Sequence, residues 1–132
     1  MVVVLFMSKT TLGLDENIEG LLCYLLGAIT GIVFLVLEKE SDFVKFHAMQ
    51  SIVISLSLMI ACIVLMIVGM ILMFIPPVGI IFGLISIFIY LLIFLVGIAL
   101  WIFGMYKAYQ GERYKFPIFG DISEDLLKKI NI

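Results

Sequence analysis

The chain has 132 residues, of which 64% are hydrophobic and 14% are charged, and its formal net charge at pH 7 is −2. A soluble domain of this size could not bury so much apolar surface, and so small a net charge gives no reason to expect a nucleic-acid partner. Helix-long apolar runs without alternating ten-residue strands disfavour a transmembrane barrel. The composition therefore predicts an all-α, polytopic membrane protein in contact with the lipid bilayer.

The N-terminal part of the sequence predicts one membrane span. Residues 1–7 are apolar but too short to cross a bilayer, so we expect them at most in the membrane interface. Residues 8–17 are polar, and a span is predicted at 18–37, about 30 Å of helix. Glu19 lies in its first turn, where we expect it to keep contact with water. A charged turn at 38–42 follows.

The middle of the sequence predicts two further spans joined by a tight turn. Residues 48–106 contain no Asp, Glu, Lys or Arg, a run long enough for two crossings. Pro76 and Pro77 interrupt this run, and consecutive prolines break a helix. The predicted spans are 43–73 and 78–106. With the first span they make a bundle of three transmembrane helices in a single membrane domain, residues 1–132.

The distribution of Lys and Arg predicts an orientation. Three spans place the first connecting loop and the tail, residues 107–132, on one side of the membrane. That side carries seven of the eight Lys and Arg residues, and only Lys9 lies on the other. The positive-inside rule then predicts a multi-pass protein of the cell (inner) membrane with its N-terminus outside and its C-terminus in the cytoplasm.

The tail predicts a short amphipathic helix at residues 121–130. Asp121 and Glu124 have the spacing of a capping box, and Ile122, Leu126 and Ile130 recur at intervals of four residues. We expect this helix to lie at the cytoplasmic membrane surface or under the bundle.

Polar side chains form a row on one face of the predicted second span. His47, Ser51 and Ser55 follow at intervals of four residues, and Gln50 lies beside them. Unpaired polar groups are unfavourable in lipid, so this face should point into the bundle. The row could line a cytoplasmic vestibule where His47 binds a ligand or changes charge. Alternatively, His47 and Gln50 hydrogen-bond the returning tail and hold it in place.

The segment at residues 109–120 predicts a turn, a short extended stretch and a second turn. Its candidate residues are Arg113, Tyr114 and Pro117. One interpretation is a docking segment for a partner, contacted through its basic side chains. The other is a re-entrant hook that packs its aromatic side chains under the bundle beside His47.

Glycines form a second candidate group, with a role in helix packing. Gly20, Gly27 and Gly31 share one side of the first predicted span, and Gly79 and Gly83 repeat the four-residue spacing in the third. This spacing lets helix backbones approach closely. The close contacts could form an oligomer interface or lie within one protomer, and the second interpretation is the more economical.

The sequence gives no support for an enzyme. There is one histidine, and no nucleophile stands at usable spacing from a base and an orienting acid. Cys23 and Cys62 lie in apolar runs without the spacing of metal ligands, so we interpret them as small buried hydrophobes. We expect no catalytic residue, no metal and no cofactor.

Several motifs resemble a known family. They are Leu14-Asp15-Glu16-Asn17, the run from Leu22 to Ile32, Phe43-Val44-Lys45-Phe46-His47-Ala48-Met49-Gln50-Ser51 and Gly111-Glu112-Arg113-Tyr114-Lys115-Phe116-Pro117. They resemble small prokaryotic membrane proteins of a domain-of-unknown-function family related to an import component of the chloroplast inner-envelope translocon (Tic). The resemblance implies a membrane-integral protein without an assigned activity, and for the plant relatives a role in preprotein passage.

Together these observations predict a non-enzymatic integral membrane protein. We expect a subunit or scaffold of a membrane assembly, with other membrane-protein subunits as partners and a link to protein transport or insertion. The alternative is a small homo-oligomeric channel or transporter whose polar row lines a path.

Overall fold

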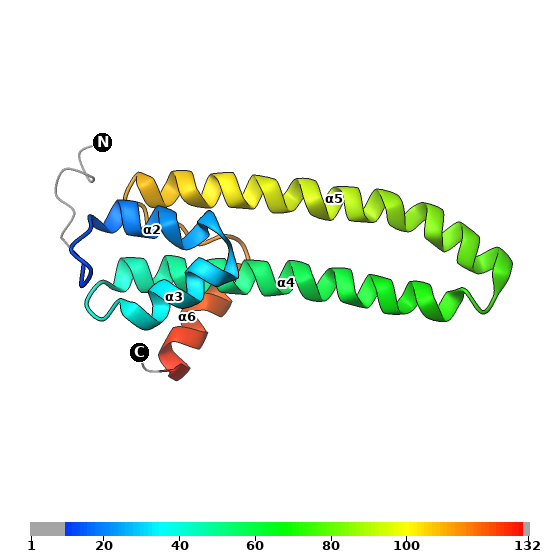
Figure 1. Cartoon of the computed structure of the whole chain (residues 1–132), viewed down its shortest axis with the longest axis horizontal. Coiled ribbons are helices and arrows are strands. Elements are labelled where there is room, and N and C mark those ends of the chain that lie inside the picture. Colours follow the sequence, from blue (N-terminus) through cyan, green and yellow to red (C-terminus); the bar gives the residue numbers. More distant parts are fainter. Residues whose placement is uncertain (1–9, 131–132) are drawn as a thin grey trace. The chain divides into compact units, whose positions relative to one another are not determined.

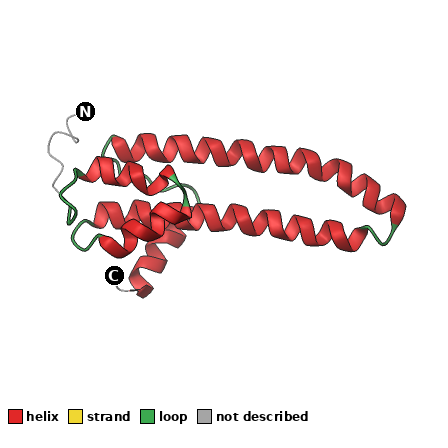
Figure 2. Ribbon diagram, in the orientation of Figure 1, coloured by secondary structure: helices red, strands yellow, loops and turns green. Residues whose placement is uncertain are grey.

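The structure is a computed structural model that describes residues 10–130, and within them it consists of helices joined by loops (Figure 2). The helices are α2 (Glu16–Leu25), α3 (Ala28–Leu37), α4 (Asp42–Leu72), α5 (Pro76–Tyr109) and α6 (Phe119–Ile130). The all-α prediction is confirmed. The predicted interfacial segment at 1–7 lies outside the described residues.

The chain divides into two compact units. Unit 1 comprises Met1–Ser55 together with Trp101–Ile132, and unit 2 comprises Leu56–Leu100. Unit 1 therefore contains α2, α3, α6, the first turns of α4 and the last turns of α5. Its apolar core includes Cys23, Val44 and Ala48, all fully buried.

The predicted first span at 18–37 is not a single helix. The structure has two helices of ten residues, α2 and α3, which pack against each other and run in opposite directions (Figure 1). The chain reverses at Gly27, whose φ of +63° lies in the left-handed region that glycine adopts without a steric penalty. A ten-residue helix is about 15 Å long, half the thickness of a bilayer's hydrocarbon core. The segment therefore forms a helical hairpin in which neither helix is long enough to span.

Side chains from three helices satisfy the backbone of the hairpin turn. The Trp101 indole nitrogen donates to the Tyr24 carbonyl at 2.8 Å, and the Ser51 hydroxyl donates to the Gly27 carbonyl at 3.0 Å. The Thr30 hydroxyl accepts from the Leu26 amide at 3.2 Å. A chain reversal at membrane depth is tolerated only where such partners replace water. Trp101 thus makes a specific contact with the backbone of the turn.

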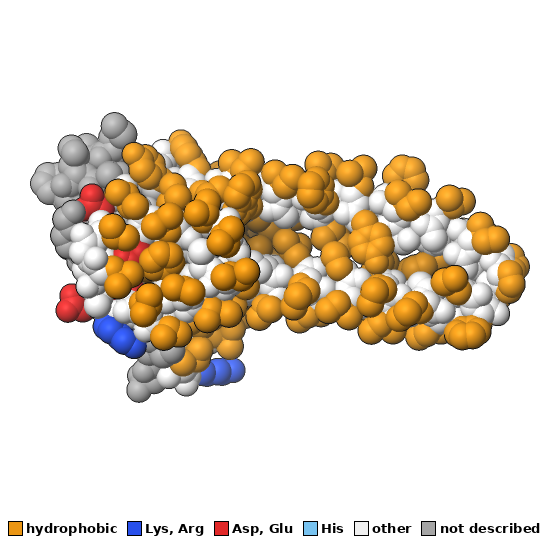
Figure 3. All heavy atoms as spheres, viewed as in Figure 1, with side chains coloured by type: hydrophobic (Ala, Val, Ile, Leu, Met, Phe, Trp, Pro, Cys, Tyr) orange, Lys and Arg blue, Asp and Glu red, His pale blue; other side chains and the backbone are white. Residues whose placement is uncertain are grey.

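Unit 2 consists of the apolar parts of α4 and α5. The two helices have 31 and 34 residues and are the only described helices long and apolar enough to cross a membrane. The break predicted at the prolines is confirmed, since α5 begins at Pro76. Side chains on the visible face of this unit are almost all hydrophobic (Figure 3). The described residues therefore contain two candidate spans where the sequence predicted three.

The predicted C-terminal amphipathic helix is present as α6. It begins at Phe119, so Asp121 lies in its first turn and not at the N-cap that the capping-box interpretation requires. Asp121 instead forms an ion pair with Lys115 at 2.7 Å. The spacing of Asp121 and Glu124 therefore reflects contacts with the segment that precedes the helix.

Candidate functional site

A buried polar network lies at the centre of unit 1. Its members are His47 and Gln50 on α4, Tyr24 on α2, and the backbone of residues 110–118, which we call the hook segment because it turns the chain from α5 into α6. The side chains of His47 and Gln50 are fully buried. Buried polar groups are stable only when hydrogen-bonded, so their partners determine what the network does.

The partners of His47 fix its tautomer. Its Nε2 lies 2.8 Å from the Glu112 carbonyl oxygen, which can only accept, so Nε2 carries the proton. Its Nδ1 lies 2.8 Å from the Tyr24 hydroxyl, which then donates to it. The rings of Phe43 and Phe46 stand edge-on around the imidazole at centroid distances of 4.6 and 5.6 Å. Both ring nitrogens are therefore occupied in a neutral histidine.

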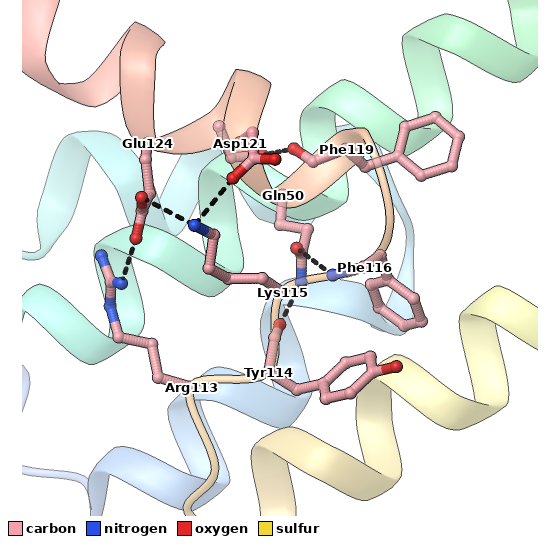
Figure 4. A network of polar contacts seen from close by, with 9 residues as sticks. Gln50, Arg113, Tyr114, Lys115, Phe116, Phe119, Asp121 and Glu124 are labelled. Atoms are coloured by element: carbon pink, nitrogen blue, oxygen red, sulfur yellow. Dashed lines mark hydrogen bonds and ion pairs between the residues drawn. The ribbon is translucent and has the colours of Figure 1, made fainter.

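Gln50 holds the hook segment at two places. Its Nε2 donates to the Tyr24 hydroxyl at 2.9 Å and to the Tyr114 carbonyl at 3.0 Å, and its Oε1 accepts from the Phe116 amide at 3.1 Å (Figure 4). With His47 on the Glu112 carbonyl, α4 bonds the backbone at every second residue from Glu112 to Phe116. That two-residue period is the geometry of an extended chain.

The intervening hook side chains pair with α6. Arg113 donates to Glu124 at 2.6 Å, and Lys115 lies 3.0 Å from Glu124 and 2.7 Å from Asp121 (Figure 4). The hydrogen bond from Arg113, and then that from Lys115, lowers the pKa of the Glu124 carboxyl. Asp121, and then Glu124, raises the pKa of the Lys115 ammonium. The Arg113 guanidinium also stacks 4.1 Å from the centre of the Phe46 ring.

The predicted polar row divides between two contacts. His47 and Gln50 meet the hook segment, whereas Ser51 meets the turn between α2 and α3. Ser55 is half-buried beside that turn, where a Cβ added at Gly27 would lie 2.8 Å from its hydroxyl oxygen. Pro117 is exposed, and its carbonyl accepts from the Phe119 amide at 2.8 Å as the chain enters α6.

The predicted glycines have unequal surroundings. A Cβ added at Gly20 would lie 2.9 Å from the Phe43 ring, and one at Gly31 would lie 2.9 Å from the Ala48 carbonyl oxygen. These contacts are within the protomer. At Gly79 an added Cβ would meet Leu72 backbone at 2.7 Å across the proline turn. At Gly83 it would meet nothing within 4 Å.

A second polar cluster, which the sequence analysis missed, surrounds Glu38. This residue was predicted in an open charged turn, but its side chain is fully buried. It accepts hydrogen bonds from the Thr11 hydroxyl at 2.6 Å and from the amides of Thr11, Glu40 and Ser41. Burial raises the pKa of this carboxyl, but the hydrogen bonds from Thr11, Ser41 and Glu40 outweigh it and lower the pKa to about 2.

Two further acids in this cluster lie in the first turn of α2 and accept hydrogen bonds, one from the turn after α3 and one from the segment before α2. Glu16 accepts from the Ser41 hydroxyl at 2.6 Å, and Glu19 accepts from the Thr10 hydroxyl. Glu19 is fully buried, so the expectation that it keeps contact with water is wrong. The hydroxyl residues Thr10, Thr11 and Ser41, each of which bonds a carboxylate, were the signal available in the sequence.

No arrangement in the described residues suggests a metal centre. Across residues 10–130, no three His, Cys, Asp or Glu side chains are placed to hold an ion together. Cys23 and Cys62 are free thiols, the first buried and the second half-buried. The prediction that they act as small hydrophobic residues agrees with these positions.

Comparison with known proteins gives the family. Residues 15–123 match the model of the magnetosome magnetite crystal formation protein family. The chain belongs to this family. It is 52% identical over 120 residues to a UPF0132 membrane protein of Methanocaldococcus jannaschii, which covers 91% of this chain and 96% of the relative. A UPF0132 membrane protein of Archaeoglobus fulgidus is 45% identical over 111 residues, covering 84% of this chain and 94% of the relative. No solved structure matches the chain.

These matches correct the resemblance to relatives of the chloroplast translocon component, which was wrong. One of its motifs, residues 43–51, contains the two side chains that hold the hook segment. Such a motif reports a local structural contact, and a short contact motif does not identify a family. The chain is a membrane protein of the magnetosome magnetite crystal formation family, and the relatives named here carry no activity in their names.

Proposed function

We propose that this protein is a non-enzymatic scaffold subunit of a membrane assembly, and that unit 1 is the part that meets its partners. One observation carries the proposal. The groups best suited to chemistry, on His47, Gln50 and Tyr24, are all engaged in fixing the hook segment. A site organised for catalysis leaves a group free to face a substrate, whereas this network produces a rigid surface.

The family description is consistent with this role. It refers to magnetosome magnetite crystal formation. Directing the growth of a solid requires components to be held in position, and it does not require turnover of a small substrate at each member of the assembly. The UPF0132 relatives are described as membrane proteins, which supports an integral membrane location for the scaffold.

The proposed scaffold has both of its ends in the cytoplasm and lies in the cell membrane. With α4 and α5 as the two spans, the residues before α4 and those after α5 lie on the same side. All eight Lys and Arg residues fall outside residues 46–106, and the turn at Pro76 has none. The positive-inside rule then favours cytoplasmic ends. The N-outside expectation depended on a third span.

Purification of the full chain in mild detergent tests the scaffold proposal. We expect a protein that co-purifies, in stoichiometric amount, with other membrane subunits from its native membrane. As a matched pair, Arg113→Gln changes an exposed hook residue of unit 1, and Ser86→Ala changes a half-buried residue of unit 2. The first should weaken partner recovery and the second should not.

A different result would contradict the scaffold proposal. A symmetric homo-oligomer without other subunits, which makes liposomes permeable to small ions, would instead support the small channel or transporter. Equal partner recovery for the two variants would show that the hook surface of unit 1 is not where partners bind.

A further inference from the structure

A charged pocket opens beside the hook segment in unit 1. It has a volume of about 420 Å³ and lies between the start of α4, the hook segment and α6. The residues that line it are Asp42, Lys45, Arg113, Glu124, Leu127 and Lys128. Apart from Arg113, whose backbone lies in the hook segment, none of them belongs to the buried network of His47 and Gln50.

The pocket has one positive charge in excess. Arg113 and Glu124 form an ion pair at 2.6 Å and neutralise each other. The other charged lining residues are two cations, Lys45 and Lys128, and one anion, Asp42. The charge that remains matches a ligand with a single negative charge.

Several hydrogen-bond donors in the pocket are still available. The Lys45 ammonium donates one hydrogen to the Lys39 carbonyl at 2.9 Å and has two others. Lys128 forms no ion pair with any residue between 10 and 130. The guanidinium of Arg113 uses only one nitrogen on Glu124 and is held in place by the Phe46 ring. Convergent Lys and Arg donors of this kind are suited to phosphate oxygens.

The surroundings of the pocket favour a lipid as the source of the phosphate. Leu127 gives the pocket an apolar wall, and on the same helix Ile122 and Ile130 are 41% and 45% exposed. An amphipathic helix with exposed isoleucines and terminal lysines is typical of the membrane interface. Basic pockets at that level are known to accept anionic lipid headgroups.

We infer that this pocket binds the phosphodiester of an anionic phospholipid, with Lys45 and Lys128 contacting the phosphate and Leu127 the start of an acyl chain. The inference rests on the proposed function only in taking α4 and α5 as the membrane spans, with α6 on the cytoplasmic side. It requires no partner protein, so its test is independent of co-purification.

Native mass spectrometry of the full chain in detergent tests this inference, with phosphatidylglycerol as the probe and phosphatidylcholine as the comparison lipid. Lys128→Gln should reduce bound phosphatidylglycerol about fivefold, the effect expected for one lysine at an anionic lipid surface. Lys129→Gln is the matched control, because it removes the same charge from an exposed neighbour outside the pocket. Lys128→Arg should keep the binding.

Three results would overturn the inference. Equal losses for Lys128→Gln and Lys129→Gln would mean general electrostatic adsorption. Equal retention of phosphatidylcholine would mean that no anionic headgroup is selected. Displacement of phosphatidylglycerol by excess glycerol phosphate would assign the pocket to a soluble phosphate. Because Lys128 is exposed, the Gln variant should unfold at the wild-type temperature, and this measurement separates lost binding from lost folding.

Discussion

Unit 1 and unit 2 depend on different physical sources of order. Unit 1 buries His47, Gln50 and Glu38 completely and satisfies them with hydrogen bonds. In unit 2, by contrast, most large side chains of residues 56–100 are exposed, and no residue in the most apolar stretch of α5 is buried. Unit 1 is therefore specified by its own polar contacts, whereas unit 2 requires lipid as its solvent.

The two units should therefore respond differently to mutation. Polar contacts in unit 1 are directional and buried, so the loss of one partner leaves another unsatisfied. Contacts in unit 2 are mostly apolar and shared with lipid, so most single changes there should be tolerated. The predictions that follow test this contrast, starting with the largest effect.

Gln50→Ala should be the most damaging of these substitutions. It leaves the Tyr114 carbonyl and the Phe116 amide without their partner and opens a cavity beside Tyr24. We expect a loss of about 4 kcal/mol in the free energy of unfolding, measured by denaturant titration in detergent. Gln110→Ala is the control, because Gln110 makes one exposed bond to Tyr106 and its loss should cost less than about 0.5 kcal/mol. Similar losses in both variants would contradict the importance of the buried network.

Glu38 should make unit 1 sensitive to acid. Hydrogen bonds hold its pKa at about 2 in the folded protein against an ordinary value of 4.5, so its stabilisation is present above pH 4.5 and is lost as the pH falls toward 2. The shift corresponds to about 3 kcal/mol at most. Glu38→Gln should remove this part of the pH dependence of unfolding, while Glu40→Gln, at an exposed neighbour, should keep it. An unchanged pH dependence of unfolding in the Glu38 variant would contradict the claim that ionised Glu38 stabilises unit 1.

Gly27→Ala should destabilise the hairpin of α2 and α3. Alanine is strained at a φ of +63°, and its Cβ would lie 2.8 Å from the Ser55 hydroxyl. We expect a loss of about 2 kcal/mol in thermal or denaturant unfolding. Gly83→Ala, in unit 2, meets nothing within 4 Å and should be neutral or slightly stabilising. Equal effects at the two glycines would remove the distinction between the units.

Glu124→Gln should have the smallest effect. It removes ion pairs with Arg113 and Lys115, but these are exposed and screened by salt. The unfolding midpoint should change little at low ionic strength and not at all at high ionic strength. A large change that persists in concentrated salt would show that α6 depends on these pairs more than on its apolar face.

Much of the fold could be predicted from the sequence because its signals are local. The charge-free run at 48–106 and the two prolines within it predicted α4, α5 and the turn between them. The period of four in the tail predicted α6. In each case the residues that predict the helix or turn are part of that same helix or turn.

The rest depends on contacts between distant parts of the chain. The run at 18–37 has the length of a span. It forms a hairpin because the backbone of Gly27 turns at a positive φ, and because Ser51 and Trp101 donate hydrogen bonds to carbonyls of that turn. The burial of Glu38 likewise requires Thr11, which is 27 residues away. Such pairings cannot be read from sequence periodicity, and for this reason the structure does not confirm the predicted third span.

Cysteine accessibility in sealed vesicles tests the central claim, that the α2 and α3 hairpin does not cross the membrane. Leu12→Cys, Met73→Cys and Glu112→Cys lie before α2, in the proline turn and after α5, and all three positions are exposed. The unsubstituted chain, with Cys23 buried and Cys62 inside α4, gives the background. We predict that an impermeant maleimide labels positions 12 and 112 from the same side and position 73 from the other. Labelling of positions 12 and 112 from opposite sides would contradict the two-span fold.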